Sequence, residues 1–204
     1  AIPYAAPPIG ALRFSPPEPV QRSAAVRDCT APGAIAPQSP SRLRVVMGDF
    51  DARQDEDCLT LTIWSPVGGR RAKPVLVWLH GGAFLSGGGA LDWYSGERLA
   101  RDGDVVVVGV NYRLGALGFL FHPRFAGGNM ALLDQQAALQ WVHDNIEAFG
   151  GDPKSVTLCG QSAGAASIAH LLAMKPAKTL FHRCILQSAP LGLAPLPADE
   201  AAAN

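Results

Sequence analysis

A serine between small residues is the part of this sequence best suited to covalent chemistry. It lies in Gly160-Gln161-Ser162-Ala163-Gly164, which matches the pattern G-x-S-x-G. A strand-like run precedes the pattern, and a run of small helix-forming residues follows it. A strand, a sharp turn and a helix in this order hold a serine hydroxyl at the tip of a strained turn. We therefore predict that Ser162 is a nucleophile and that Gln161 supports it.

A second segment, His80-Gly81-Gly82-Ala83-Phe84, offers the groups that such a serine needs. Acyl transfer requires backbone N–H donors aimed at the developing oxyanion, and glycine lets the main chain come close. We predict that the N–H groups of Gly82, Ala83 and Ala163 are these donors, and that Gly81 shapes the turn. A glycine loop without chemistry is the alternative, and the serine pattern further along the chain argues against it.

A serine nucleophile also needs a general base, and the histidines of this sequence do not supply one in the expected order. In hydrolases built around this turn, an acid and then a histidine follow the serine. Only His170 and His182 follow Ser162, and we interpret both as structural, whereas His80 is expected to brace the glycine segment. No pair of histidines has metal-ligand spacing. We expect no metal and no cofactor, and we expect the catalytic acid and histidine to lie outside this chain.

The elements that would position these residues alternate between strand and helix from residue 74 onward. We predict strands at 75–79, 104–110, 155–159 and 183–187, and helices at 95–102, 131–148 and 164–174. The apolar run 75–79 is typical of a strand buried on both faces, whereas alternation over 58–65 predicts a strand at an edge or in an antiparallel position. This order predicts an α/β protein with a mainly parallel sheet and helices on both faces. The carboxyl ends of such strands, where His80 and Ser162 fall, hold the active site.

Composition allows one core and argues against charged partners. The chain has 204 residues, 48% of them hydrophobic, with 17 basic and 17 acidic residues. Neither nucleic acid nor an anionic membrane is implied as a partner, and no apolar run reaches transmembrane length. Residues 1–50 are rich in proline, so we expect an extended segment wrapped on the core. Cys159 and Cys184 lie in apolar strand-like runs and are expected to be buried.

Taken in order, the motifs resemble the type-B carboxylesterases, the bacterial and cholinesterase-like branch of the α/β-hydrolases. The resemblance is nearly continuous from Ile2 to Ser188. It rests on Ile2-Pro3-Tyr4-Ala5, Pro7-Pro8-Ile9-Gly10, Leu12-Arg13-Phe14, Glu56-Asp57-Cys58-Leu59, His80-Gly81-Gly82-Ala83-Phe84, Asn111-Tyr112-Arg113-Leu114-Gly115, Gly118-Phe119-Leu120, Leu133-Asp134-Gln135, Phe149-Gly150-Gly151-Asp152-Pro153, the serine pattern and Gln187-Ser188.

The resemblance implies an α/β-hydrolase fold of which residues 1–204 form a single partial, truncated domain that lacks its C-terminal half. It also implies a serine hydrolase that cleaves carboxylic esters through an acyl-enzyme, with Asp134 and Asn129 bracing the region of the serine. This chain alone would be inactive. The alternative from a different class is a catalytically silent cholinesterase-like module for protein interaction. The intact serine and donor segment favour the enzyme.

Two departures from the family pattern refine these expectations. Met47-Gly48-Asp49-Phe50 offers no tryptophan where cholinesterases hold a cationic group, so a small neutral ester is the expected substrate. Cys58 matches a position that forms a disulfide in many members, but Ile35-Ala36-Pro37-Gln38 contains no partner cysteine. We expect Cys58 to be a free thiol, with Cys29 as the only alternative partner in the N-terminal region.

Overall fold

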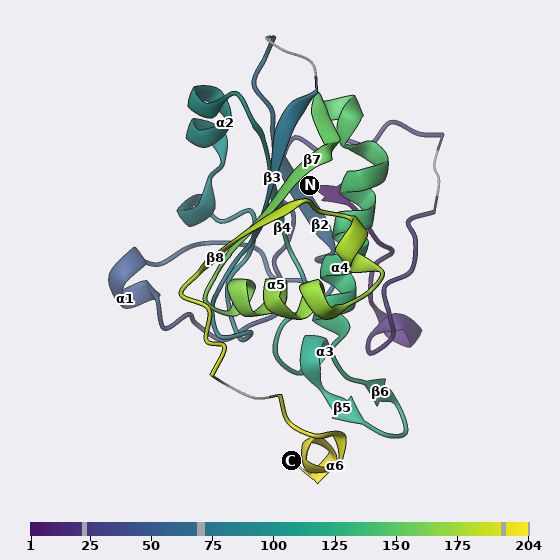
Figure 1. Ribbon diagram of the computed structural model, residues 1–204. Helices are drawn as coiled ribbons and strands as arrows, with labels where there is room; N and C mark the ends of the chain where they lie inside the picture. Colours follow the sequence, from purple (N-terminus) through teal and green to yellow (C-terminus); the bar gives the residue numbers. More distant parts are fainter. Residues whose placement is uncertain (22–23, 69–71, 193–194, 204) are drawn as a thin grey trace.

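A computed structural model describes residues 1–21, 24–68, 72–192 and 195–203. The main feature of these residues is a six-stranded sheet in the order β1-β2-β4-β3-β7-β8 (Figure 1). Its strands are β1 (Ile2–Pro3), β2 (Thr60–Trp64), β3 (Lys73–Leu79), β4 (Val106–Val110), β7 (Gly151–Gln161) and β8 (Arg183–Gln187). The pairs β1/β2 and β2/β4 are antiparallel and the other three pairs are parallel. The predicted, mainly parallel sheet is confirmed, and β2 has the expected antiparallel position.

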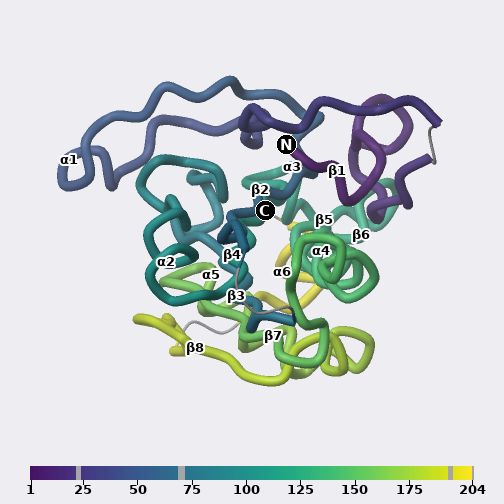
Figure 2. The backbone as a smooth tube through the Cα atoms, turned by 90° about the horizontal axis from the view of Figure 1, so that it is seen from above, coloured from purple at the N-terminus to yellow at the C-terminus, as the bar shows by residue number. Residues whose placement is uncertain are grey.

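Helices cover both faces of this sheet, as predicted. The α-helices are α1 (Arg44–Met47), α2 (Glu97–Gly103), α3 (Gly115–Phe119), α4 (Met130–Asn145), α5 (Ala163–Ala173) and α6 (Ala198–Ala203). Short 3-10 helices span Gly10–Leu12, Asp92–Tyr94, Ile146–Phe149 and Ala177–Thr179, and β5 (Phe121–His122) pairs with β6 (Ala126–Gly127). Both views place α2 on one side of β3 and β4 and α4 on the other (Figures 1 and 2). None of the described helices has the length and apolar character that a membrane crossing requires.

Burial of the strands follows their apolar sequences, with one difference from expectation. Every residue of β4 is buried, because this strand lies between β2 and β3 and has helices on both sides. The run 75–79 was expected to be buried on both faces, but in β3 only alternate residues are fully buried. Leu76 and Trp78 are half-buried, on the opposite face of the strand from Val75, Val77 and Leu79. The ring of Trp78 contacts Tyr94 there, with 5.4 Å between ring centroids.

The expectation that Cys184 is buried is wrong. Cys184 lies in β8, which pairs only with β7 and therefore forms the edge of the sheet within the described residues. Four of the five β8 residues are exposed, including Cys184 and Ile185. An apolar strand sequence indicates burial only when other elements cover the strand. Cys159, one strand further in, is buried as expected.

The N-terminal region runs beside the sheet at the end opposite β8. Figure 2 shows the described part of residues 1–55 along the side of β1 and β2, far from β8. Tyr4 fixes this region to the core, because its buried hydroxyl donates a hydrogen bond to the carbonyl oxygen of Asn111 at 2.7 Å. Residues 35 and 54 form an isolated parallel bridge, which joins two parts of the segment before β2 to each other.

Candidate active site

Ser162 occupies a strained turn between β7 and α5. Its φ is 53° and its ψ is −118°, a combination that costs a residue with a side chain about 1–3 kcal/mol. Two backbone hydrogen bonds hold the strain in place: the N–H of Ser162 donates to Gln187 O at 2.8 Å, and Ser162 O accepts from the N–H of Ala166 at 2.9 Å. The serine is thus fixed by β8 on one side and by the first turn of α5 on the other.

The small residues around Ser162 are required by close backbone contacts. A Cβ on Gly160 would lie 2.7 Å from the carbonyl carbon of Gly164. A Cβ on Gly164 would lie 2.1 Å from the backbone oxygen of Leu79, at the end of β3. Backbone atoms cannot rotate away as a side chain can. The turn can therefore pass over the carboxyl end of β3 only because both positions are glycine.

Residues 80–89, which we name the glycine loop, lie directly against this turn. A Cβ on Gly81 would lie 2.6 Å from Oε1 of Gln161 and 3.2 Å from Cβ of Ser162. Positive φ angles occur at Gly82 (119°), Ala83 (55°) and Phe84 (62°), which turns the chain sharply. The carbonyl oxygen of Gly82 closes this turn by accepting hydrogen bonds from the N–H groups of Leu85 and Ser86, at 3.0 and 3.1 Å.

The three predicted donors are backbone N–H groups without an acceptor. Within the described ranges, no hydrogen bond is made by the N–H of Gly82, Ala83 or Ala163, although Ala163 is 1% exposed. Buried N–H groups without partners are rare in proteins. Ala163 is also the first residue of α5, where the helix dipole favours negative charge. Free N–H donors at the start of α5 and in a loop whose Gly81 lies against Ser162 are the kind of groups that stabilise an oxyanion.

His80 is buried at the start of the glycine loop. Its Nδ1 lies 2.8 Å from Gly81 O, and because a carbonyl oxygen only accepts, Nδ1 carries the proton. Its ring stacks on Tyr112 with centroids 4.3 Å apart, and the Tyr112 hydroxyl donates to His80 O at 2.6 Å. Burial lowers the pKa of His80 to about 4, which the hydrogen bond to Gly81 opposes only in part. His80 is a neutral packing residue here, and its contacts with Gly81 and Tyr112 fit the bracing interpretation.

Three consecutive buried side chains after β4 each hold a different segment. Asn111 Oδ1 accepts from the N–H of Gly89 at 2.8 Å, while its Nδ2 donates to Ala34 O at 3.1 Å. Tyr112 holds the start of the glycine loop, and Arg113 holds the N-terminal region and α4. The sequence motif containing these residues supported the family resemblance but did not reveal these contacts. The signal available in the sequence was three consecutive residues with polar groups directly after a buried strand.

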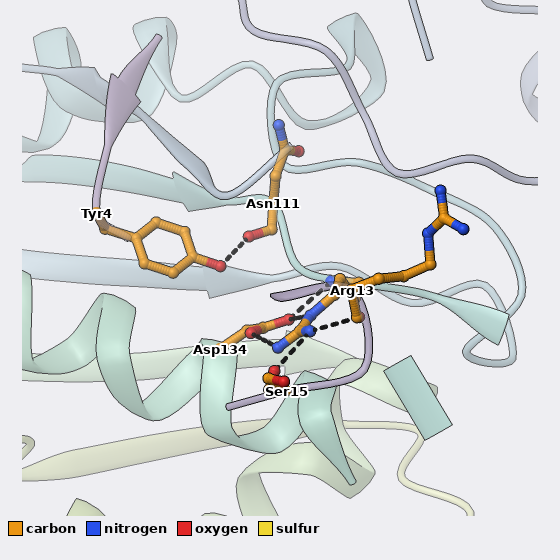
Figure 3. Close-up of polar contacts among 6 residues, drawn as sticks. Tyr4, Arg13, Ser15, Asn111 and Asp134 are labelled. Atoms are coloured by element: carbon orange, nitrogen blue, oxygen red, sulfur yellow. Dashed lines mark hydrogen bonds and ion pairs between the residues drawn. The ribbon is translucent and has the colours of Figure 1, made fainter. Parts of the chain in front are cut away.

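Asp134 forms a buried ion pair with Arg113, and Figure 3 shows its carboxylate among polar contacts that reach Arg13 and Ser15. Its carboxylate accepts hydrogen bonds from Nη2 and Nε of Arg113, at 2.6 and 2.8 Å. Arg113 Nη1 also donates to the carbonyl oxygens of Arg13 and Ser15, at 3.1 and 2.9 Å. Asp134 therefore holds the N-terminal region through Arg113. Gln135, also on α4, does reach α5, because its Nε2 donates to Ser167 Oγ at 3.1 Å.

The histidines and Asn129 do not complete the site. His182 directly precedes β8, and its Nδ1 accepts from the N–H of Val156, in the middle of β7, at 3.3 Å. His170 is exposed on α5, and Asn129 precedes α4 in a left-handed conformation without a side-chain capping bond. Among the described residues, no histidine forms a hydrogen bond with Ser162 and no His, Cys, Asp and Glu cluster could hold a metal ion.

Comparisons with known proteins give a consistent set of relatives. A model of the carboxylesterase family matches residues 1–198. The probable N-octanoylanthranilate hydrolase AqdA2 of Rhodococcus erythropolis is 55% identical over 184 residues, which are 89% of this chain and 40% of that protein. The para-nitrobenzyl esterase of Bacillus subtilis (strain 168) is 50% identical over 190 residues, 92% of this chain and 39% of that protein. A solved structure titled thermophilic PNB esterase is 44% identical with a TM-score of 0.90, covering 99% of this chain and 42% of that one. The chain thus spans about two fifths of the length of these relatives.

Proposed function

The chain belongs to the carboxylesterase family, and from this membership we propose that the protein carrying it hydrolyses carboxylic esters through an acyl-enzyme on Ser162. The predicted α/β-hydrolase fold and the resemblance to type-B, para-nitrobenzyl-esterase-like enzymes are both confirmed. The observation that best supports the mechanism is the set of three unpaired N–H groups beside a serine in a strained turn.

The proposed reaction has two steps. Ser162 Oγ attacks the ester carbonyl carbon, and the N–H groups of Gly82, Ala83 and Ala163 bind the resulting oxyanion. Collapse of this intermediate releases the alcohol and leaves an acyl group on Ser162, which a water molecule then removes as the carboxylic acid. The base that takes the serine proton is proposed to be a histidine outside these 204 residues, oriented by an acid that also lies outside them.

A neutral ester fits the described surroundings of Ser162. The side chain next to the serine is the uncharged Gln161, and its Oε1 would lie 2.6 Å from a Cβ placed on Gly81. Because Gln161 is uncharged and residues 47–50 contain no tryptophan that could bind a cation, we propose a small neutral substrate.

Replacement of Ser162 tests the proposal. In the full-length protein, Ser162→Ala should lower kcat for a p-nitrophenyl ester by a factor on the order of 10⁶ and abolish labelling by a fluorophosphonate. The fold should survive, because alanine fits between the small neighbours. Ser39→Ala, on an exposed serine in the N-terminal region, is the matched control and should retain full activity. A Ser162→Ala enzyme that keeps a tenth of the activity would show that the nucleophile lies elsewhere.

The chain on its own should be inactive, because no base within it follows Ser162 in the required order. Residues 1–204 would be expressed, checked for a folded monodisperse species and assayed for ester hydrolysis. Turnover above ~1 s⁻¹, within the usual range of enzymes, would contradict this expectation and make His170 or His182 the base.

A further inference from the structure

Gln38 forms a two-way contact with the backbone of the glycine loop, although the two are far apart in sequence. The N–H of Gly87 donates to Gln38 Oε1 at 2.6 Å, and Gln38 Nε2 donates to Gly87 O at 2.7 Å. The side-chain amide thereby satisfies both backbone groups of one buried residue. Gly87 has a φ of 114° and belongs to no helix or strand. Regular secondary structure therefore does not supply these hydrogen bonds, and Gln38 does.

The segment that carries Gln38 is itself firmly held. The N–H of Gln38 donates to Gln54 Oε1 at 2.8 Å, and residues 35 and 54 form a bridge. Ala34, Ile35 and Ala36 are buried. This segment also contacts the glycine loop at a second point, because a Cβ on Gly88 would lie 2.4 Å from Ile35 Cγ2. Gln38 therefore projects from a fixed support.

Displacement of Gly87 would be passed on to the oxyanion donors. A Cβ on Gly87 would lie 2.4 Å from Nδ1 of His80 and 2.7 Å from Gly81 O, so no space separates Gly87 from the His80 ring or from the Gly81–Gly82 peptide. Gly81 in turn lies against Ser162. This Gly81–Gly82 peptide itself carries the N–H of Gly82. Hydrogen bonds from Gln38 to Gly87 and close contacts from Gly87 to this peptide therefore connect Gln38 to the donors.

We propose that Gln38 is a positioning residue for ester hydrolysis: it fixes Gly87 and, through the Gly81–Gly82 peptide, sets the distance of the Gly82 and Ala83 N–H groups from the oxyanion. The loop needs such external support because five of its ten residues are glycine, which is conformationally free when unconstrained. This inference rests on the function proposed above for Ser162.

The test compares three variants of the full-length protein. Gln38→Ala removes both bonds, Gln38→Glu keeps the shape and an acceptor for the N–H of Gly87 but loses the donor to Gly87 O, and Gln140→Ala is the control. Gln140 is an exposed glutamine on α4 whose side chain, among the residues that the structure describes, bonds only to Asp144. Active sites are titrated with a fluorophosphonate, so that kcat is expressed per correctly folded site.

We expect kcat per titrated site to fall about 10- to 100-fold in Gln38→Ala, as misplacement of a catalytic group by about 1 Å can do, with KM within threefold. Gln38→Glu should lie between Gln38→Ala and the parent, and Gln140→Ala should match the parent. Affinity for a trifluoromethyl ketone, whose adduct carries an oxyanion, should fall in parallel with kcat. A merely structural role predicts fewer titrated sites with unchanged kcat for each, and that result would overturn the proposal.

Amide hydrogen exchange at Gly87 tests the contact independently of the reaction. Its exchange rate should rise at least tenfold in Gln38→Ala and stay unchanged in Gln140→Ala. If the parent protein neither hydrolyses esters nor reacts with the fluorophosphonate, the proposed function fails, while the exchange result still shows whether Gln38 holds the loop. Unchanged exchange at Gly87 would refute the positioning role by itself.

Discussion

Replacing Asp134 with asparagine should destabilise the protein strongly, because it leaves the buried charge of Arg113 without a counter-ion. The side chains of Arg113 and Asp134 are 1% and 0% exposed. Asparagine keeps the shape of the residue but turns one acceptor into an N–H₂ group facing the guanidinium. Breaking a buried ion pair by removing one partner costs about 3–5 kcal/mol. That is a large part of the roughly 5–15 kcal/mol by which domains are stable.

The loss can be measured as a shift in unfolding. For a domain of about 150–250 residues each kcal/mol lowers Tm by roughly 2–4 °C, so Asp134→Asn should lower it by about 6–20 °C. Urea unfolding should show the same loss in free energy. Because Arg113 also holds Arg13 O and Ser15 O, limited proteolysis should cut the N-terminal region near residues 13–15 faster in the variant.

Two further variants separate the ion pair from general effects of mutation. Asp144→Asn changes an exposed carboxylate on the same helix and should alter stability by less than about 0.5 kcal/mol. Arg113→Met combined with Asp134→Leu should be less damaging than Asp134→Asn, because no unpaired charge remains. A loss below about 1 kcal/mol in Asp134→Asn would show that the pair contributes little and that the reasoning from its burial is wrong.

Three further outcomes are expected. Burial lowers the pKa of His80 to about 4, so below about pH 6.5 this histidine is protonated in the unfolded chain but stays neutral in the folded protein. The free energy of unfolding should therefore decrease by up to about 3 kcal/mol as the pH falls from 6.5 toward 4. Urea unfolding of His80→Gln should lack this decrease. Gly164→Ala should cost about 1–3 kcal/mol in thermal unfolding, whereas Gly192→Ala, with no atom within 4 Å of the new Cβ, should cost nothing measurable. Cys58 is fully buried, and its pKa is raised to about 12, chiefly by desolvation. A thiol reagent should therefore modify Cys58 only after the protein is denatured, and no reductant should be needed. A Cys29–Cys58 bridge found by mass spectrometry would contradict this.

The strands and helices that build the sheet could be read from sequence because their signals are local. The apolar runs at 75–79, 155–159 and 183–187 fall within β3, β7 and β8. The helix expected at 131–148 ends as an α-helix at Asn145, and a 3-10 helix continues to Phe149. The helix Gly115–Phe119 was not predicted, because two of its five residues are glycine and glycine disfavours helix.

The parts of the site that escaped prediction depend on distant contacts. The serine and the glycine loop each carry a recognisable motif. Each motif also follows a predicted strand of a parallel sheet, so their proximity could be inferred from the sequence. Gln38, Asn111 and Arg113 act through hydrogen bonds to segments 49 to 100 residues away, and no local pattern encodes such pairs. Cys184 was misjudged for a related reason, since its burial depends on what covers β8 rather than on the sequence of β8.

The long reach of the N-terminal contacts also bears on how the protein is made. The Tyr4 hydroxyl finds its acceptor 107 residues later, and Arg13 O meets its donor 100 residues later. A ribosome adds about 5–20 residues per second, so Tyr4 and Arg13 wait roughly 5–20 s for their partners to be synthesised. Contacts this distant also slow folding itself. Until Asn111 and Arg113 have been synthesised, the proline-rich segment of residues 1–50 is therefore open to chaperones and proteases, and only then can it dock against these two residues.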